Sequence, residues 1–389
     1  MRGLFLGCVL LVLPVVAVAQ SCGGSFSSFV AQLKAEAVAN GHAQAQVNAF
    51  FNGVRQDAKV LKADRSQGVF KKTFTEFART VISKNRLDKG RANARRYASI
   101  FKRAEREYGI PPGVLLAFWA LETDYGSFQG NFNTLHALVT LSHDCRRPHL
   151  FRPQVFAALE LYTRDGFDPR RTTGAWAGEI GMVQMLPEDI IRHGVDGDGD
   201  GRVDLKGSVP DAILSGARML QGFGWQPGQP WLQEVTVPAQ MDWSKTGLNT
   251  RLPVADWARM GVKARSGAFQ GGGAASILLP QGRKGPAFIA YPNYRIYFDW
   301  NQSYVYVTTA AYFATRLSGA PVFNAMSPEP GLTDSQMKDL QRKLANRGHD
   351  VGKIDGILGS GTRAAVQAEQ QRLGLPADAW PTRALLSNL

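Results

Sequence analysis

A single carboxylate stands near the end of a strongly apolar stretch of the sequence. Residues 114–123 are apolar on nearly every side of a predicted helix, and Glu122 is the one acid among them. Burial beside Trp119 or Phe118 would disfavour the ionised form of this side chain and raise its pKa. A carboxylic acid that stays protonated near neutrality can donate a proton to a leaving group, as cleavage of a glycosidic bond requires. The residues alone leave a second interpretation open, in which Glu122 is a structural acid paired with an arginine.

Asp124 is the nearest candidate for a second carboxylate. Side chains two residues apart on a helix do not face each other. Glu122 and Asp124 would therefore form a pair only if the helix ends between them, which Gly126 makes possible.

A second group of acids alternates with glycine in residues 196–204. Carboxylates stand at positions 1, 3 and 5 of an EF-hand calcium loop, and glycine at position 6 allows the sharp turn. Position 12, where an EF-hand has a bidentate Glu, is Gly207, and the next acid is Asp211. Aspartates crowded in this way repel one another without a cation. A flexible acidic turn that binds calcium weakly or not at all is the alternative. The ligands predicted within this loop are Asp196, Asp198, Asp200 and the Arg202 carbonyl.

The sequence holds three cysteines, Cys8, Cys22 and Cys145. Cys8 lies in a segment typical of an export signal, with a basic second residue, an apolar run over residues 4–18 and a small-x-small cleavage site at residues 17–19. In an oxidising compartment the two remaining cysteines favour one Cys22–Cys145 disulfide. Two buried free thiols are the alternative.

The leader and the charge indicate where the chain works. We expect the mature protein in the periplasm, with an outer-membrane lipid anchor on Cys22 as the alternative, although Gln20 fits a lipobox poorly. The formal net charge is +13, and such a surface attracts polyanions, which outside the cytoplasm include the cell wall and lipid head groups. Residues 84–106 are basic at helical spacing but hold no base-reading motif. We therefore interpret them as a solvated helix face and expect no nucleic-acid partner.

Helical periodicity dominates the elements that must position these residues. Residues 235–300 differ, because they are richer in Pro, Gly and Trp and carry β-like runs at residues 277–279 and 294–298. Residues 327–331 have the composition of a linker. The segment after them has two strong helices and a short last one, which make a minimal three-helix bundle. Helices are predicted within 23–60 and over 92–107, 114–123, 131–143, 153–164, 187–193, 209–223, 304–317, 333–347, 360–373 and 382–388.

Four segments, in the same order, resemble motifs of the lytic murein transglycosylase B family. The end of the apolar helix resembles the catalytic turn of that family, and residues 134–141 resemble the helix after it. Residues 177–187 are similar to its Ala-Gly-x-x-Gly-x-x-Gln-Phe-x-Pro signature, and residues 301–306 to its Asn-x-Ser-x-x-Tyr motif. The resemblance covers about residues 26–316. It implies a mainly α fold, namely a lysozyme-like catalytic domain with additional helical lobes and a small mixed α/β lobe.

The resemblance also implies roles for individual residues. Glu122 becomes the sole catalytic acid/base, and Asp211 closes the metal site, because some members of the family have a longer loop with a late Asp as ligand. Structural roles are the alternatives, since an amide such as Gln184 often bonds only to the backbone and a Tyr in an apolar helix is more often a core residue. The substrate-binding residues implied by the resemblance are Gln184, Asn301, Tyr306, Tyr125 and Met182.

One position departs from the family pattern. Ala175 stands where the family often has a Ser whose hydroxyl is thought to bond to the catalytic carboxylate. Loss of a hydrogen bond to the ionised form would raise the pKa of Glu122 further. This departure also leaves the orientation of the acid open.

The C-terminal segment is similar to the peptidoglycan-binding domain of the three-helix type. The resemblance lies in residues 340–344, 348–352 and 355–366 and in Gln370. It implies wall binding, and a tethered binder raises the local concentration of its enzyme at an insoluble substrate. The predicted organisation is a signal peptide at 1–19, a catalytic domain at 20–325, a linker at 326–332 and a peptidoglycan-binding domain at 333–389.

The family mechanism implies a lyase that acts on the glycan strands of peptidoglycan. Glu122 would protonate the MurNAc–GlcNAc β-1,4 oxygen and then deprotonate the 6-hydroxyl of the same MurNAc, so that a 1,6-anhydro end forms without water. A hydrolytic muramidase and a non-catalytic wall-binding scaffold are the alternatives; the intact Glu122 and Gln184 argue against the scaffold. We expect no cofactor for the chemistry, structural Ca²⁺ at most, a monomer, and membrane association only through the wall or a lipid anchor.

Overall fold

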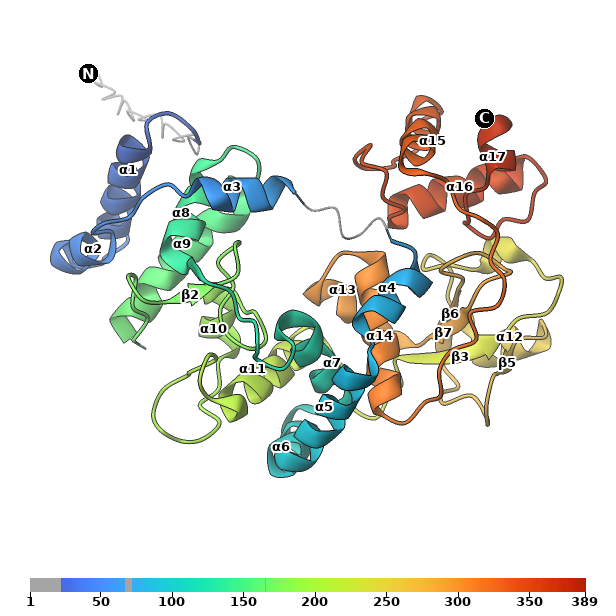
Figure 1. Ribbon diagram of the computed structural model, residues 1–389, viewed down its shortest axis with the longest axis horizontal. Helices are drawn as coiled ribbons and strands as arrows, with labels where there is room; N and C mark the ends of the chain where they lie inside the picture. Colours follow the sequence, from blue (N-terminus) through green and yellow to red (C-terminus); the bar gives the residue numbers. More distant parts are fainter. Residues whose placement is uncertain (1–21, 67–71, 165) are drawn as a thin grey trace, which may run out of the picture.

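The computed structural model describes residues 22–66, 72–164 and 166–389. The signal peptide predicted over residues 1–19 lies outside these ranges. Helices dominate the fold, and a small antiparallel sheet forms a separate lobe, as the sequence predicts (Figure 1). Within the described residues, no helix combines the length and the apolar character needed to cross a bilayer.

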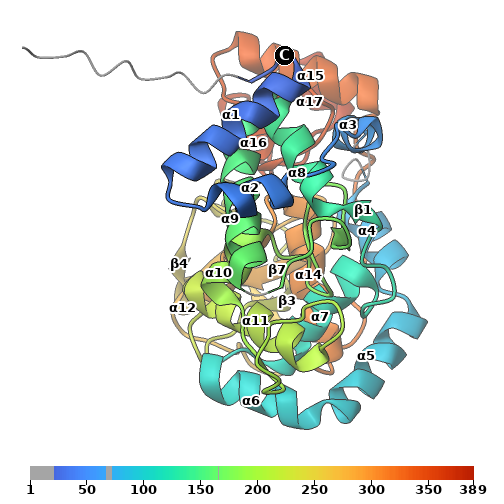
Figure 2. The same ribbon diagram turned by 90° about the vertical axis from the view of Figure 1, so that its left-hand side faces the viewer.

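The first group of helices forms the helical lobe on the left of Figure 1 and faces the viewer in Figure 2. In both views α1 and α2 lie beside α8 and α9. Phe29, Leu33 and Phe50 from this N-terminal pair are almost fully buried in the main core. The helices of this lobe are α1 (Phe26–Ala39), α2 (Gln44–Phe50), α3 (Ala58–Arg65), α8 (Thr134–His143), α9 (Pro148–Arg164) and α10 (Pro187–His193), and α11 (Val209–Gly222) continues it toward the centre.

A disulfide closes this lobe. Cys22 and Cys145 are bonded, with their Cα atoms 5.1 Å apart, which is the pairing that the sequence predicts. The backbone N–H of Gly23 donates to the carbonyl of His143 at 2.9 Å. The crosslink spans 123 residues of sequence, and a bond that closes so long a loop removes much conformational freedom from the unfolded chain.

The central helices are α4 (Phe74–Val81), α5 (Lys84–Arg96), α6 (Ala98–Tyr108), α7 (Pro112–Thr123) and α14 (Tyr304–Leu317). Pro112 opens α7, where its missing N–H costs nothing. Helix α7 packs against α14, and both are buried around nearly their whole circumference. The prediction of a single helix over residues 92–107 is wrong. Tyr97, with ψ of 30°, ends α5 and begins α6, so the chain turns there.

The sheet lobe on the right of Figure 1 has the strand order β4-β6-β7-β3-β5, with every neighbouring pair antiparallel. The run at residues 277–279 lies in and just after β6, as predicted. The β-like run at residues 294–298 is not a strand, because it forms the end of a 3₁₀ turn and the start of α13, with Tyr294 and Tyr297 buried in the core. The strands and short helices are β1 (Phe132–Asn133), β2 (Thr173–Gly174), β3 (Leu232–Thr236), β4 (Leu252–Pro253), β5 (Lys263–Ala264), β6 (Ala274–Leu278), β7 (Ala287–Ala290), η2 (Trp243–Lys245), α12 (Val254–Arg259), η3 (Pro292–Tyr294) and α13 (Tyr297–Trp300).

Three helices follow residue 333 and form a small bundle with its own apolar core, at the upper right of Figure 1. They are α15 (Asp334–Asn346), α16 (Ser360–Arg372) and α17 (Arg383–Ser387). Thr333 and Gln336 form a capping box that starts α15. Leu340, Leu344 and Val366 are fully buried, so the predicted three-helix bundle is present.

Candidate active site

Glu122 lies in the last turn of α7, where this helix meets α13 and α14. The hydroxyl of Tyr306 and the indole N–H of Trp300, the latter at 3.1 Å, both donate to Oε1 of Glu122. Oε2 accepts no hydrogen bond from any residue that the structure describes. One carboxylate oxygen is therefore fixed by two donors, and the other is free to exchange a proton with a bound molecule.

Aromatic stacking holds the Trp300 donor in place. The ring of Phe118, one turn before Glu122 on α7, stacks on Trp300 with a centroid distance of 4.2 Å and on Tyr297 at 5.0 Å. These rings exclude water from one side of the carboxyl group. Burial raises the pKa of Glu122, and the hydrogen bonds from Tyr306 and Trp300 only partly oppose this effect. Burial beside the rings of Phe118 and Trp300 therefore favours the protonated acid that the sequence predicts, whereas the hydrogen bonds from Tyr306 and Trp300 favour its ionised form.

Asp124 does not form a pair with Glu122. Helix α7 ends at Thr123, and Asp124 adopts a left-handed conformation with φ of 49°. Its carboxylate oxygens accept hydrogen bonds from Arg86 at 2.9 Å and Lys89 at 3.0 Å. Burial alone would raise the pKa of Asp124, but the bonds and charges of Lys89 and Arg86 outweigh it and lower the pKa. Asp124 is therefore a structural anion that joins α7 to α5.

The loop between β2 and α10 runs beside the end of α7 and carries Gln184. The hydroxyl of Thr123 donates to the carbonyl of Met182 at 2.7 Å and accepts the N–H of Gly126 at 2.9 Å. Gly181 has φ of 81°, and a Cβ at this position would collide with Leu205. The residue after Glu122 thus pins the loop to the catalytic helix.

Gln184 is held mainly by backbone. Its φ of 53° is unusual for a residue with a side chain, which marks an imposed conformation. Its Nε2 donates to the carbonyls of Gly181 at 2.7 Å and Gln129 at 3.4 Å. The side-chain oxygen has no bond from a described residue, so only this oxygen is available to a ligand.

Three further residues with predicted substrate contacts are committed to the protein. The Tyr125 hydroxyl donates to the carbonyl of Arg86 on α5 at 2.8 Å. The Met182 side chain is 7% exposed and belongs to the core. The Asn301 side-chain oxygen accepts the N–H of Ser303 at 2.9 Å and shapes the turn before α14. The structure brings Tyr306 to Glu122 and shows these three residues in packing and turn roles; their contacts with substrate stay a prediction.

Two residues of the site were not predicted from the sequence. Trp300 immediately precedes the Asn301 motif, and an aromatic residue at that point was the available signal. Glu179 lies within the glycine-rich signature, and its Oε2 is buried with no hydrogen-bond partner among the described residues. Burial raises the pKa of Glu179 to about 7. Hydrogen bonds from backbone groups oppose this rise, and the charge of Glu122 adds to it. Glu179 is therefore the second acid near Glu122, in place of Asp124.

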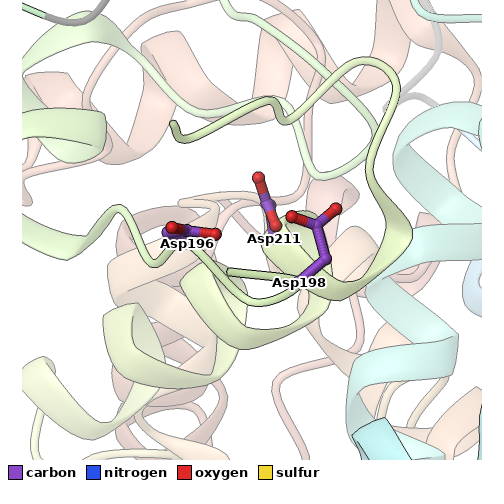
Figure 3. Close-up of side chains that lie close together, drawn as sticks. All are labelled: Asp196, Asp198 and Asp211. Carbon is purple, nitrogen blue, oxygen red and sulfur yellow. The ribbon is translucent and has the colours of Figure 1, made fainter. Parts of the chain in front are cut away.

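Asp196 and Asp198 of the acidic loop, residues 196–204, come together with Asp211 in the first turn of α11 (Figure 3). One oxygen from each lies within 4.8 Å of the others. Asp211 is fully buried, and its oxygens accept the N–H groups of Gly197 at 2.9 Å and Asp204 at 2.7 Å. Within the described residues, none of the three aspartates pairs with Lys or Arg. A divalent cation fits this donor set, because it would supply the missing positive charge.

Asp200 lies outside this group, although the EF-hand pattern predicts it as a ligand. Its Oδ1 accepts the N–H of Arg202 at 2.9 Å, and its other oxygen is 3.8 Å from the Arg202 guanidinium. The side chain therefore stabilises the turn and is not part of the group of three carboxylates. The prediction that the Arg202 carbonyl binds a metal stays a prediction.

Comparison with known proteins identifies relatives of this chain. The chain is 27% identical over 230 residues to membrane-bound lytic murein transglycosylase B of Escherichia coli strain K12, and spans 62% of the length of that relative. Two crystal structures of SltB3 from Pseudomonas aeruginosa, in complex with NAG-anhNAM-pentapeptide and with NAG-NAM-pentapeptide, are each 36% identical in sequence to the present chain. They superpose with TM-scores of 0.85 and 0.86, cover 94% of this chain and are themselves covered to 99% and 100%.

Two families account for nearly all of the described chain. Residues 333–389 match the family described as putative peptidoglycan binding domain. The transglycosylase SLT domain family matches residues 25–315, which include Glu122, both of its hydrogen-bond donors and the acidic loop. The chain belongs to the SLT transglycosylase family, with a peptidoglycan-binding domain at its C-terminal end.

Proposed function

We propose that the chain is a peptidoglycan lytic transglycosylase that cleaves the β-1,4 bond between MurNAc and GlcNAc and leaves 1,6-anhydro-MurNAc ends. Membership of the SLT transglycosylase family supports the substrate and the type of reaction. The observation that carries the finer proposal is the one-sided hydrogen bonding of Glu122. Both donors bind Oε1, so Oε2 alone carries the proton and later accepts one.

In the first step Oε2 of Glu122 gives its proton to the glycosidic oxygen, and the bond from this oxygen to C1 of MurNAc breaks. GlcNAc leaves with a free hydroxyl group. Positive charge develops on the MurNAc ring, and the acetamido oxygen of the same sugar shields it. The carboxylate that remains is stabilised by Tyr306 and Trp300, whose bonds strengthen as charge builds on Glu122.

In the second step the Glu122 carboxylate takes the proton of the MurNAc 6-hydroxyl. The oxygen freed in this way bonds to C1 and closes the anhydro ring, so Glu122 is protonated again and no water is consumed. A pKa raised by burial suits both steps, because the same group must act as acid and then as base. Asp124 is tied to Arg86 and Lys89 and is unsuited to activate a water molecule.

Gln184 is the polar group of the glycine-rich signature that remains for the sugar. We infer that its side-chain oxygen accepts a hydrogen bond from the bound glycan, since its nitrogen is used by Gly181 and Gln129. Calcium at Asp196, Asp198 and Asp211 would be structural and would hold the loop that follows α10. The chemistry needs no cofactor.

We also propose that the protein works in the periplasm as a monomer. The Cys22–Cys145 disulfide supports an oxidising compartment. The C-terminal domain supports attachment to the wall.

The test is digestion of purified sacculi with the mature protein, followed by mass analysis of the released muropeptides. Anhydro products are lighter than hydrolysis products by one water molecule. We expect anhydro ends only. Reducing ends would contradict the transglycosylase proposal and favour a muramidase, and release of no muropeptides would favour a wall-binding scaffold.

Two variants assign the acid. Glu122→Gln keeps the shape of the side chain but carries no exchangeable acid proton, so we expect it to release no products. Asp124→Asn should retain the type of product, because this residue only links α7 to α5. Digestion by Glu122→Gln at the wild-type rate would remove Glu122 from the mechanism.

A further inference from the structure

The C-terminal bundle contacts the catalytic domain through a buried arginine. Arg363 on α16 is 9% exposed, and its guanidinium carbon lies 4.3 Å from the centre of the Tyr304 ring. The same guanidinium donates to the carbonyl of Pro280 at 2.6 Å. Arg363 has no carboxylate within ion-pair distance among the described residues, so the Tyr304 ring face takes the place of a counter-ion. Such a contact is specific, since it requires a planar cation against an aromatic ring.

Further polar contacts surround Arg363. The Gln367 amide donates to the carbonyls of Trp243 at 3.2 Å and Thr246 at 2.9 Å in the sheet lobe. Asp378 accepts the backbone N–H of Arg283 at 3.0 Å. These groups would be left without their partners if the bundle moved away. The bundle is therefore docked on the catalytic domain, and does not hang from it by residues 326–332 alone.

Tyr304 connects this docking contact with the active site. It is the first residue of α14, and Ser303 caps the helix by accepting the N–H of Tyr306. Tyr306, in the same first turn, donates to Glu122. A shift of Tyr304 against Arg363 would therefore move the turn that places the Tyr306 hydroxyl.

We propose that Arg363 of the peptidoglycan-binding domain is a positioning residue for the reaction, which acts through Tyr304 on the hydrogen bond between Tyr306 and Glu122. The C-terminal domain then completes the catalytic domain in addition to binding the wall. This inference rests on the proposed function, because it needs Glu122 as the reacting group. It separates two models: a tether affects only the insoluble substrate, whereas a positioning residue also affects a soluble one.

The test compares full-length wild type with Arg363→Met and Arg363→Lys on a soluble tetrasaccharide fragment of uncross-linked peptidoglycan, too short to profit from tethering. For Arg363→Met we expect kcat to fall about tenfold with KM unchanged. We also expect the alkaline limb of the kcat profile to move to higher pH, because a weaker bond from Tyr306 raises the pKa of Glu122. Arg363→Lys, which keeps the charge but not the planar group, should lie between the two.

Arg342→Met is the matched control. Arg342 lies on α15 of the same bundle, its side chain is 58% exposed, and its ion pair is with Asp339 of its own helix. The Arg342→Met variant loses the same charge from the same domain as Arg363→Met, but the change leaves the contacts with the catalytic domain in place. Its kinetics on the soluble fragment should therefore match those of wild type. Binding of each variant to purified sacculi is measured in parallel and should be unchanged.

Wild-type kcat and pH profile in Arg363→Met would overturn the proposal. If Arg363→Met does not fold, as judged by its melting curve, Tyr304→Leu removes the ring face instead, and wild-type kinetics in this variant would also contradict it. A wild-type enzyme that releases reducing ends would contradict the proposed reaction, yet the variants could still be ranked by kcat. The two failures are therefore distinguishable.

Discussion

The molecule treats carboxylates in opposite ways in two regions. At the end of α7, Glu122 lies among aromatic rings, and two donors from one side hold it. At the acidic loop, Asp196 and Asp198 lie together with Asp211 of α11, and backbone N–H groups hold Asp196 and Asp211. Neither group has a Lys or Arg partner among the described residues. The first arrangement favours a proton on the acid, and the second favours a shared cation.

The difference shows how surroundings select the chemistry of one functional group. Isolation and low polarity make the neutral acid stable, so Glu122 can exchange a proton. Crowding makes the charged state costly unless a metal neutralises it. Asp124 is the third case, because Arg86 and Lys89 keep it ionised and structural.

The largest expected effect on activity comes from changing Glu122. Glu122→Gln should lower the rate of muropeptide release by about 10³-fold, in the range usual for loss of a general acid and base. Its melting temperature should not fall, because an amide avoids the cost of a buried charge. Glu160→Gln, on the exposed surface of α9, is the matched control and should retain full activity. A small effect at Glu122 would break the contrast between the two regions.

The hydrogen-bond donors to Glu122, Tyr306 and Trp300, should have the next largest effect on kcat. Tyr306→Phe or Trp300→Phe should lower kcat about tenfold, because each removes a hydrogen bond to the charged carboxylate formed in the first step. These bonds lower the pKa of Glu122 against burial, so their loss raises it. The alkaline limb of the pH profile of kcat should therefore move to higher pH. A downward movement would mean that the donors favour the neutral acid.

Glu179 provides a test of isolation at a second buried acid. Its folded pKa of about 7 exceeds the ordinary value of 4.5, so the folded state holds a proton that the unfolded state has lost between these values. Wild-type stability should therefore fall as pH rises through this window and then level off.

Glu179→Gln has no such ionisation. Its stability relative to wild type should increase from pH 4.5 to 7, by at most about 3 kcal/mol. Urea unfolding at several pH values measures this difference. An equal offset at every pH would show that the Glu179 carboxyl is not neutral in the folded state.

The smaller of the two expected effects on stability concerns the crowded acids. Calcium at 100 times its dissociation constant should stabilise the fold by about 2.7 kcal/mol, seen as a higher melting temperature than in EGTA. Asp211→Asn should abolish this difference, whereas Asp200→Asn should keep most of it, since Asp200 lies outside the cluster. A response to calcium that survives Asp211→Asn would place the ion elsewhere.

Local patterns were predictable from the sequence. The apolar helix with Glu122, the three-helix bundle, the Cys22–Cys145 pair and the DGDG loop each follow from residues close in sequence or from cysteine number. Resemblance to the transglycosylase B family pointed to Tyr306, whose hydroxyl donates to Glu122 in the structure; its contact with substrate stays a prediction. Local periodicity failed at Tyr97, where one expected helix is two, and at residues 294–298, where tyrosines that suit a strand fill the core from short helices.

Long-range pairs were not predictable. Trp300 reaches Glu122 across 178 residues, and Arg363 reaches Pro280 across 83. Tyr125, Met182 and Asn301 match family motifs, but their side chains pack or shape turns. A motif specifies which residues recur; only the fold decides which of them face the acid.

The disulfide at Cys22 has a consequence for the attachment of a lipid to this residue. A sulfur atom bonded to Cys145 cannot also carry the thioether of a diacylglyceryl group. Crosslinking and acylation are mutually exclusive fates for this atom, so the oxidised form is excluded from lipoprotein maturation at this residue. In the oxidised form, Cys22 cannot provide an acyl anchor, and the peptidoglycan-binding domain is the part of the chain suited to attachment to the wall.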